Sequence, residues 1–161
     1  MDTISEDVGL QKTDGLKAIL LAGLIAGTLD ITGACVSGWL RSGRNPIWIF
    51  QSVAGGLYGA ETFNGGYSTA IQGLILHFFI ATTWAAVFYL ASRQLKFMLD
   101  HPIITGVLYG IIVWSFMNLV VLPLTAYKVW PTLSWGMVIG LLIIIFCIGL
   151  PISLIIRRLS R

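Results

Sequence analysis

The stretch LKAILLAGLIAGTLDITGACVSGWL, residues 16–40, is an apolar run that contains a single acid, Asp30. As a helix it would be about 37 Å long, enough to cross a hydrocarbon core of about 30 Å. On a helical wheel Gly23, Gly27 and Gly33 share one stripe with Asp30, and larger apolar residues cover the rest. Small residues let helices approach closely in lipid, so this stripe predicts a face buried against neighbouring helices. The acid would then point at protein, as expected for a group whose insertion into a span costs roughly 3 kcal/mol.

The remaining composition indicates a membrane protein throughout. Of the 161 residues 57% are hydrophobic and only 11% are charged, which is too apolar for a soluble domain of this size. We therefore expect an all-α, polytopic fold with four transmembrane helices in one domain, residues 16–156. A polar, loosely ordered tail (residues 1–15) would precede it, and a basic tail (157–161) would follow. The three further spans are predicted at residues 69–91, 102–122 and 134–156.

A shorter helix is predicted directly after the first span, at residues 46–58. Asn45 is a good N-cap and Pro46 suits the first helical position. A helix of this length would measure about 20 Å, too short to cross. Because apolar residues occupy one face and small or polar residues the other, we expect an interfacial or re-entrant helix. It would pack over the first two spans through its Gly55 and Gly56 side.

The distribution of basic residues predicts the orientation. If the spans alternate, seven Lys or Arg residues lie on the side of the termini and three on the other. The positive-inside rule then places both termini in the cytoplasm. The three on the outer side are Arg41, Arg44 and Lys128. The net charge of +3 does not indicate nucleic-acid binding, because the basic residues cluster at the membrane ends of the spans.

Three polar residues are predicted at similar depths in the outer half of the bundle. Counting residues from the outer boundary gives about 15 Å for Asp30, 12 Å for His77 and 6 Å for Asn118. The 46–58 segment would bring Gln51, and the loop after it Glu61, above them. A carboxylate beside an imidazole perturbs both protonation equilibria, which favours a proton-linked or ligand-binding site open to the outer face. A buried polar pair that only fixes helix register is the alternative.

Other chemistry finds no support in the sequence. One internal histidine cannot ligate a bis-His haem within one chain, and no Cys/His spacing suits zinc, so we expect no cofactor and no metal. Because no nucleophile elbow or phosphate loop is present either, we expect no enzymatic activity. Cys35 and Cys147 would lie about 7 Å and 20 Å deep, too far apart for a disulfide.

Several short motifs together resemble a known family. They are GTLD (27–30), RNP (44–46), SVAGG (52–56), FNGG (63–66), GLILH (73–77) and WSFMN (114–118), the last followed by Pro123. Over residues 16–155 the chain resembles the YagU-like family of small uncharacterised bacterial inner-membrane proteins. The resemblance implies four helices in a bacterial cytoplasmic (inner) membrane and no assigned activity or cofactor.

Two classes of function follow from these patterns. One is a small transporter or ligand-binding protein built on Asp30 and His77. The other is a non-catalytic accessory or structural subunit, whose glycine stripes pack against spans of a second copy or of another membrane protein. The third span carries the same close-packing pattern as the first, at Gly106 and Gly110. An outer cavity lined by Asp30 and His77 would favour the first class, whereas outward-facing glycine stripes would favour the second.

Overall fold

The computed structural model describes residues 3–128, 130–132 and 134–160, with side chains from residue 15 onward. Within these ranges the chain forms helices and no strands. The first half contains α1 (Thr3–Ser42), α2 (Pro46–Tyr58), a 3₁₀ segment η1 (Gly59–Asn64), α3 (Gly66–Gln94) and the short α4 (Phe97–Asp100). The second half contains α5 (Pro102–Phe116), η2 (Met117–Val121), α6 (Leu122–Leu124), α7 (Trp135–Ile144), η3 (Ile145–Gly149) and α8 (Leu150–Leu159).

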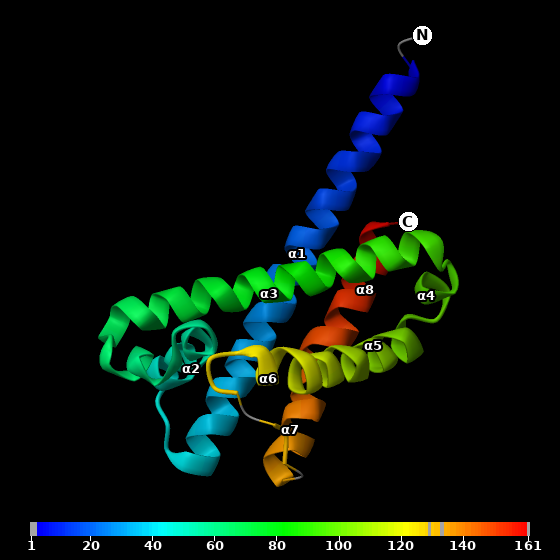
Figure 1. Cartoon of the computed structure of the whole chain (residues 1–161). Coiled ribbons are helices and arrows are strands. Elements are labelled where there is room, and N and C mark those ends of the chain that lie inside the picture. The colour runs from blue at the N-terminus through cyan, green and yellow to red at the C-terminus, as the bar shows by residue number, and fades with distance from the viewer. Residues whose placement is uncertain (1–2, 129, 133, 161) are drawn as a thin grey trace.

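Four helical stretches are long and apolar enough to cross a membrane. They are Gly15–Ser42, Gly66–Gln94, Pro102–Leu124 and Trp135–Leu159. The prediction of an all-helical fold with four helices able to span a membrane is thereby confirmed, and these four helices suggest a multi-pass membrane protein. The loosely ordered tail expected at residues 1–15 is wrong from Thr3 onward, because α1 is helical from that residue and projects beyond the other helices (Figure 1). Once a span has nucleated a helix, each further residue adds one hydrogen bond at little extra cost.

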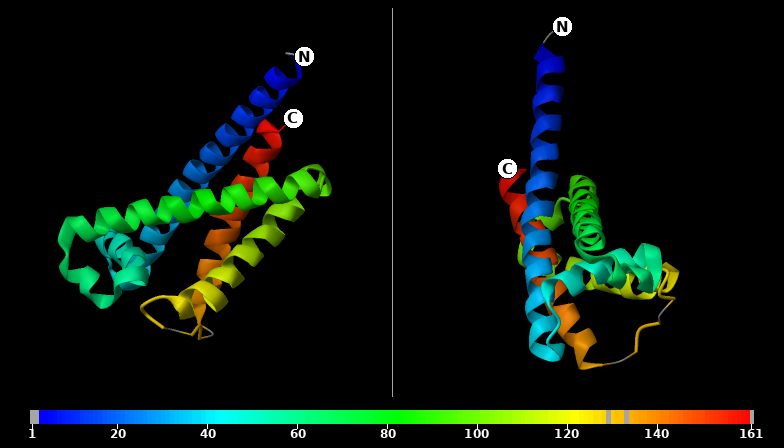
Figure 2. Two further views of the ribbon diagram at one scale, coloured as in Figure 1. Left: turned by 45° about the horizontal axis from the view of Figure 1, so that its top comes forward. Right: turned by 90° about the vertical axis from the view of Figure 1, so that its left-hand side faces the viewer.

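The spans form two layers that cross each other (Figures 1 and 2). One layer holds α1 beside the long helix made of α7, η3 and α8, and the other holds α3 and α5. Both termini and α4 lie toward one end of the bundle, while α2 and the connection between α6 and α7 lie toward the other. Because four spans cross the bundle an even number of times, the two ends of the chain lie on the same side.

Glycine allows the layers to approach closely. A Cβ on Gly23 would lie 2.6 Å from the Thr82 Cα, and a Cβ on Gly27 would lie 2.9 Å from the Phe78 ring. Alanines 18, 22 and 26, none of them exposed, extend this face of α1. Between α5 and the fourth span, a Cβ on Gly110 would lie 2.7 Å from the Ile145 Cα. Backbone contact replaces side-chain burial here, as is usual between helices in lipid.

The short helix α2 begins as its sequence predicts. The Asn45 side chain accepts a hydrogen bond of 2.8 Å from the Trp48 amide, and Pro46 opens the first turn. Its predicted docking face is wrong. The helix does pack over the first two spans, α1 and α3, but its contact at Gly73 of α3 is made by Phe50 and Ala54, although Gly55 is also buried. Gly55 and Gly56 face Tyr127 and Thr125 beyond the third span; a location at or in a membrane boundary stays a prediction.

Two spans contain a π-helical segment one turn before a proline. Segment η2 precedes Pro123 and η3 precedes Pro151. A proline ring lacks the N–H of a normal helix and collides with the carbonyl four residues back, here that of Leu119 or Cys147. Because both carbonyls lie inside the π segments, the widened turn gives the ring room. The sequence analysis did not predict these two π turns.

The docking of α2 on α3 predicts a large effect at Gly73. A Cβ at this position would overlap the Phe50 carbonyl oxygen, a backbone atom that cannot move without shifting α2. Gly73→Ala should therefore lower the free energy of unfolding by about 1–3 kcal/mol, despite the better helix propensity of alanine. Thermal unfolding of the purified protein in detergent measures it. Gly56→Ala is the matched control, since its Cβ would lie an ordinary 3.5 Å from Thr125. Equal losses in the two variants would contradict this packing.

Candidate functional site

A cavity of about 140 Å³ lies where all four spans meet. Each span and α2 contribute side chains to its wall, and the only ionisable ones among them are Asp30 and His77. The remaining lining is apolar or aromatic, namely Val53, Ile80, Ala81, Trp84, Val113, Met117, Ile144 and Ile148. A few well-placed polar groups in an otherwise apolar hollow are typical of ligand sites.

Asp30 reaches the cavity because of its place on the small-residue face of α1. It follows Gly27 by three residues, so both lie on the side of α1 that meets α3. Neighbouring Leu29, on another face, is 45% exposed. No ion pair of 4.0 Å or less joins the Asp30 carboxylate to a cation in the described part of the chain. The carboxylate therefore borders the cavity without a charged partner at contact distance.

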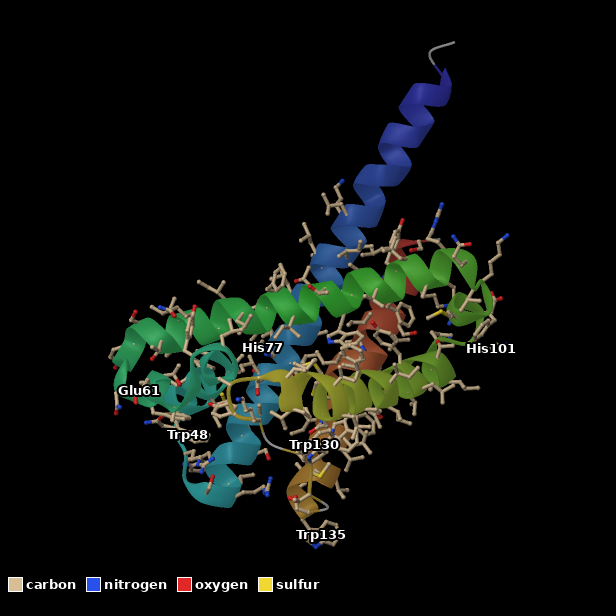
Figure 3. All side chains as sticks on the ribbon, viewed as in Figure 1. Trp48, Glu61, His77, His101, Trp130 and Trp135 are labelled. Atoms are coloured by element: carbon tan, nitrogen blue, oxygen red, sulfur yellow. The ribbon has the colours of Figure 1, made fainter. Side chains whose placement is uncertain are left out.

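His77 is held in a defined orientation by the backbone of α1. Its Nε2 lies 2.9 Å from the Gly27 carbonyl oxygen. Because a carbonyl oxygen only accepts, Nε2 must donate, and Nδ1 is left as the atom that gains or loses a proton. Glycine makes this bond accessible, since a Cβ at Gly27 would push against Phe78 and Ala81 on α3. Figure 3 shows His77 near the crossing of α1 and α3.

The sequence thus predicted correctly that Asp30 and His77 lie close together, but they are not joined directly. They share the cavity wall, while the imidazole N–H is taken by Gly27. A direct hydrogen bond or ion pair between the two side chains is absent from the described structure. Coupling through water in the cavity stays a prediction.

The other three predicted site residues lie outside the cavity. Gln51 donates to the Gly66 carbonyl (3.0 Å) and to the Thr69 hydroxyl, so it fastens α2 to the start of α3. Asn118 donates to the Trp114 carbonyl within its own helix (2.9 Å). Glu61 is exposed in η1, far from His77 (Figure 3). Estimated depth alone brought them into the predicted site, and local hydrogen bonding or exposure separates them from it.

Sequence reasoning missed the aromatic and π-helical parts of the wall. Met117 belongs to η2 and Ile148 to η3, so both widened turns border the cavity. π segments recur at functional sites, and the prolines that follow them were the available signal. Tyr109 holds Trp84 in place, because its hydroxyl donates to the Trp84 carbonyl and its ring packs edge-on against the Trp84 ring.

A second, larger pocket adjoins the cavity. Its volume is about 260 Å³, and it shares Val53, Ile80 and Met117 with the Asp30–His77 wall. Tyr127, from the segment after the third span, closes one side by donating to the Ser52 carbonyl (3.1 Å). Partial burial raises the pKa of the Tyr127 phenol, which keeps it a donor. The shared residues make a thin apolar partition between the two spaces.

Comparison with known proteins gives no match to a protein-family model, a curated protein or a solved structure.

A double-mutant cycle tests whether Asp30 and His77 are coupled. Asp30→Asn and His77→Gln should each change the free energy of unfolding, and the double variant should depart from additivity by about 0.5–3 kcal/mol. The physical reason is that two ionisable groups share one apolar cavity, where charges are weakly screened. Chemical denaturation in detergent at neutral pH measures all four proteins. Additivity within about 0.5 kcal/mol would show that the two groups do not interact.

Proposed function

We propose that this protein is a proton-linked small transporter or ligand-binding protein of the membrane, with Asp30 and His77 as its titrating pair. One observation carries the proposal: the only ionisable groups on the cavity wall face a space to which every span contributes. Ionisable residues inside a bundle are costly in a membrane and commonly belong to proton relays or substrate pathways. A site bounded by all four spans is also sensitive to small movements of any of them.

The volume of the Asp30–His77 cavity suits a small ligand. At roughly 30 Å³ per water, a cavity of about 140 Å³ holds a few waters or one small solute. A carboxylate and an imidazole Nδ1 can exchange a proton across such a water chain. His77 is anchored through Nε2, so its ring can change protonation at Nδ1 without losing its bond to Gly27.

The accessory-subunit hypothesis has weaker support. It requires glycine stripes that face outward toward a partner. Instead, the glycines singled out in the first and third spans lie against other helices of the same chain: Gly23 and Gly27 on α3, Gly33 on α7 and η3, and Gly106 and Gly110 on η3 and α8. Their close-packing capacity is used within the protomer.

We further propose that the protein belongs with the YagU-like proteins and resides in a bacterial cytoplasmic membrane. The motif resemblance and the four apolar helices support this assignment. The excess of basic residues beside the termini supports a cytoplasmic location for both ends.

Proton flux tests the proposed function. Purified protein in liposomes with a trapped pH-sensitive dye should acidify or alkalinise the lumen when a potassium diffusion potential is applied. Asp30→Asn should reduce the flux by about tenfold or more, the loss typical of removing a positioned proton-transfer group.

Glu61→Gln is the matched control, because it removes the same charge from an exposed acid outside the cavity. It should leave the flux unchanged. The proposal in its proton-conducting form would be refuted if the proton flux into wild-type liposomes were no faster than into empty ones. Equal losses of flux in the two variants would refute it as well.

Topology is a separate prediction. A reporter enzyme active only in the periplasm should be inactive when fused after Arg161, because seven basic residues hold both ends in the cytoplasm. The same reporter inserted after Lys128 should be active. The reverse pattern would overturn the orientation but not the four-span fold.

A further inference from the structure

A basic pocket lies at the C-terminal end of α1, next to the start of α2. Its volume is about 320 Å³. Two arginines, Arg41 and Arg44, line it together with Ser37, Gly38, Ser42 and Ile49. No carboxylate is among these residues, and neither guanidinium has an acidic partner within 4.0 Å in the described part of the chain. Two of the three basic residues predicted for the outer side therefore converge on one hollow.

Both guanidinium groups are positioned by neighbouring contacts. The Arg44 guanidinium carbon lies 3.5 Å from the centroid of the Trp48 ring, so the planar group is stacked. Trp48 is in turn stacked on Phe63, with centroids 4.9 Å apart. Arg41 reaches across to the first turn of α7, where a Cβ on Gly136 would lie 2.6 Å from its terminal nitrogen. These contacts lower the entropy lost when a ligand binds the two side chains.

The chemistry of the pocket selects an anion. Paired guanidinium forks bind phosphate with parallel N–H donors, which a single lysine cannot reproduce. The C-terminus of α1 opposes an anion with roughly half an elementary charge, whereas the two arginines supply two full charges. Ile49 adds an apolar wall beside the charged groups. The pocket therefore suits a phosphate that carries an apolar substituent.

The position of the pocket indicates the source of that phosphate. The first apolar span ends at Ser42, between the two arginines. Tryptophans gather at the same end of the molecule, with Trp39, Trp130 and Trp135 each at least 65% exposed, as Figure 3 shows for Trp48, Trp130 and Trp135. Exposed tryptophan at the ends of spans is typical of the headgroup region of a bilayer. This position favours a lipid headgroup as the source of the phosphate.

We propose that Arg41 and Arg44 form a binding site for the phosphate of an anionic phospholipid headgroup, separate from the Asp30–His77 cavity. Occupation would link the end of α1 to α2 and α7 through a ligand held by both arginines. Neither the proton-linked function nor its titrating pair is needed for this site, so the two proposals stand or fall separately.

Native mass spectrometry of the purified full-length chain tests the site. The protein is titrated in detergent with phosphatidylglycerol and, separately, with phosphatidylcholine. Wild type should retain phosphatidylglycerol preferentially, and Arg41→Gln/Arg44→Gln should weaken its binding by about tenfold or more, since hydrogen bonds to charged groups are lost. Arg44→Lys keeps the charge but loses the planar stack on Trp48, so its binding should be weakened by a smaller factor.

The matched control is Arg93→Gln/Lys96→Gln, which removes two exposed basic residues at the opposite end of the bundle. It should bind phosphatidylglycerol as wild type does. Equal weakening in both double variants, or equal binding of the two lipids, would overturn the proposal in favour of general charge attraction. Inorganic phosphate that raises the unfolding temperature through the two arginines, with lipid binding unaffected by their loss, would overturn the lipid source. If the double variant fails to fold, Arg44→Lys decides: binding as tight as wild type would refute the site.

Discussion

The close crossing of α1 and α3 is the contact on which the rest of the structure depends. At Gly23 and Gly27 the backbone of α1 lies against α3 with no side chain between them. In lipid, apolar burial gives no net drive for helices to associate, so this proximity must come from van der Waals contact and hydrogen bonds. The same absence of side chains exposes the Gly27 carbonyl to His77. One pair of small residues thus sets both the helix geometry and the orientation of the imidazole.

The cavity exists because other helices do not pack as closely beyond this crossing. Helices that meet at an angle diverge on either side of the contact, and Asp30 lies one turn past Gly27. Two π turns, each followed by a proline, widen the third and fourth spans beside that space. Large side chains such as Trp84 and Met117 fill part of the gap, and about 140 Å³ remains. The glycines, which set the close crossing, and the prolines, which follow the widened turns, therefore both shape the same cavity.

Polar side chains elsewhere in the bundle form hydrogen bonds that hold the helices together. The Thr105 hydroxyl donates to the Met98 carbonyl and Ser153 donates to the Pro102 carbonyl, which ties α8 to the start of α5. Gln51 joins α2 to α3 in the same way. Buried hydroxyls and amides that find backbone acceptors need no further partner. Asp30 differs from them because an ionised carboxylate can only accept, and most side chains that share its cavity wall are apolar.

Four spans, their limits to within a few residues, the α2 cap at Asn45 and the inward face of α1 follow from the sequence, because hydropathy, capping and small-residue periodicity are local properties. The proximity of Asp30 and His77 also followed, from similar depths on consecutive spans. The sequence could not separate them from Gln51, Asn118 and Glu61, since depth does not say which side chain already has a hydrogen-bond partner. Nor could it place Gly55 and Gly56 against Tyr127 and Thr125. Those outcomes depend on crossing angles and on turns widened before Pro123 and Pro151, which only the packing of all four spans decides.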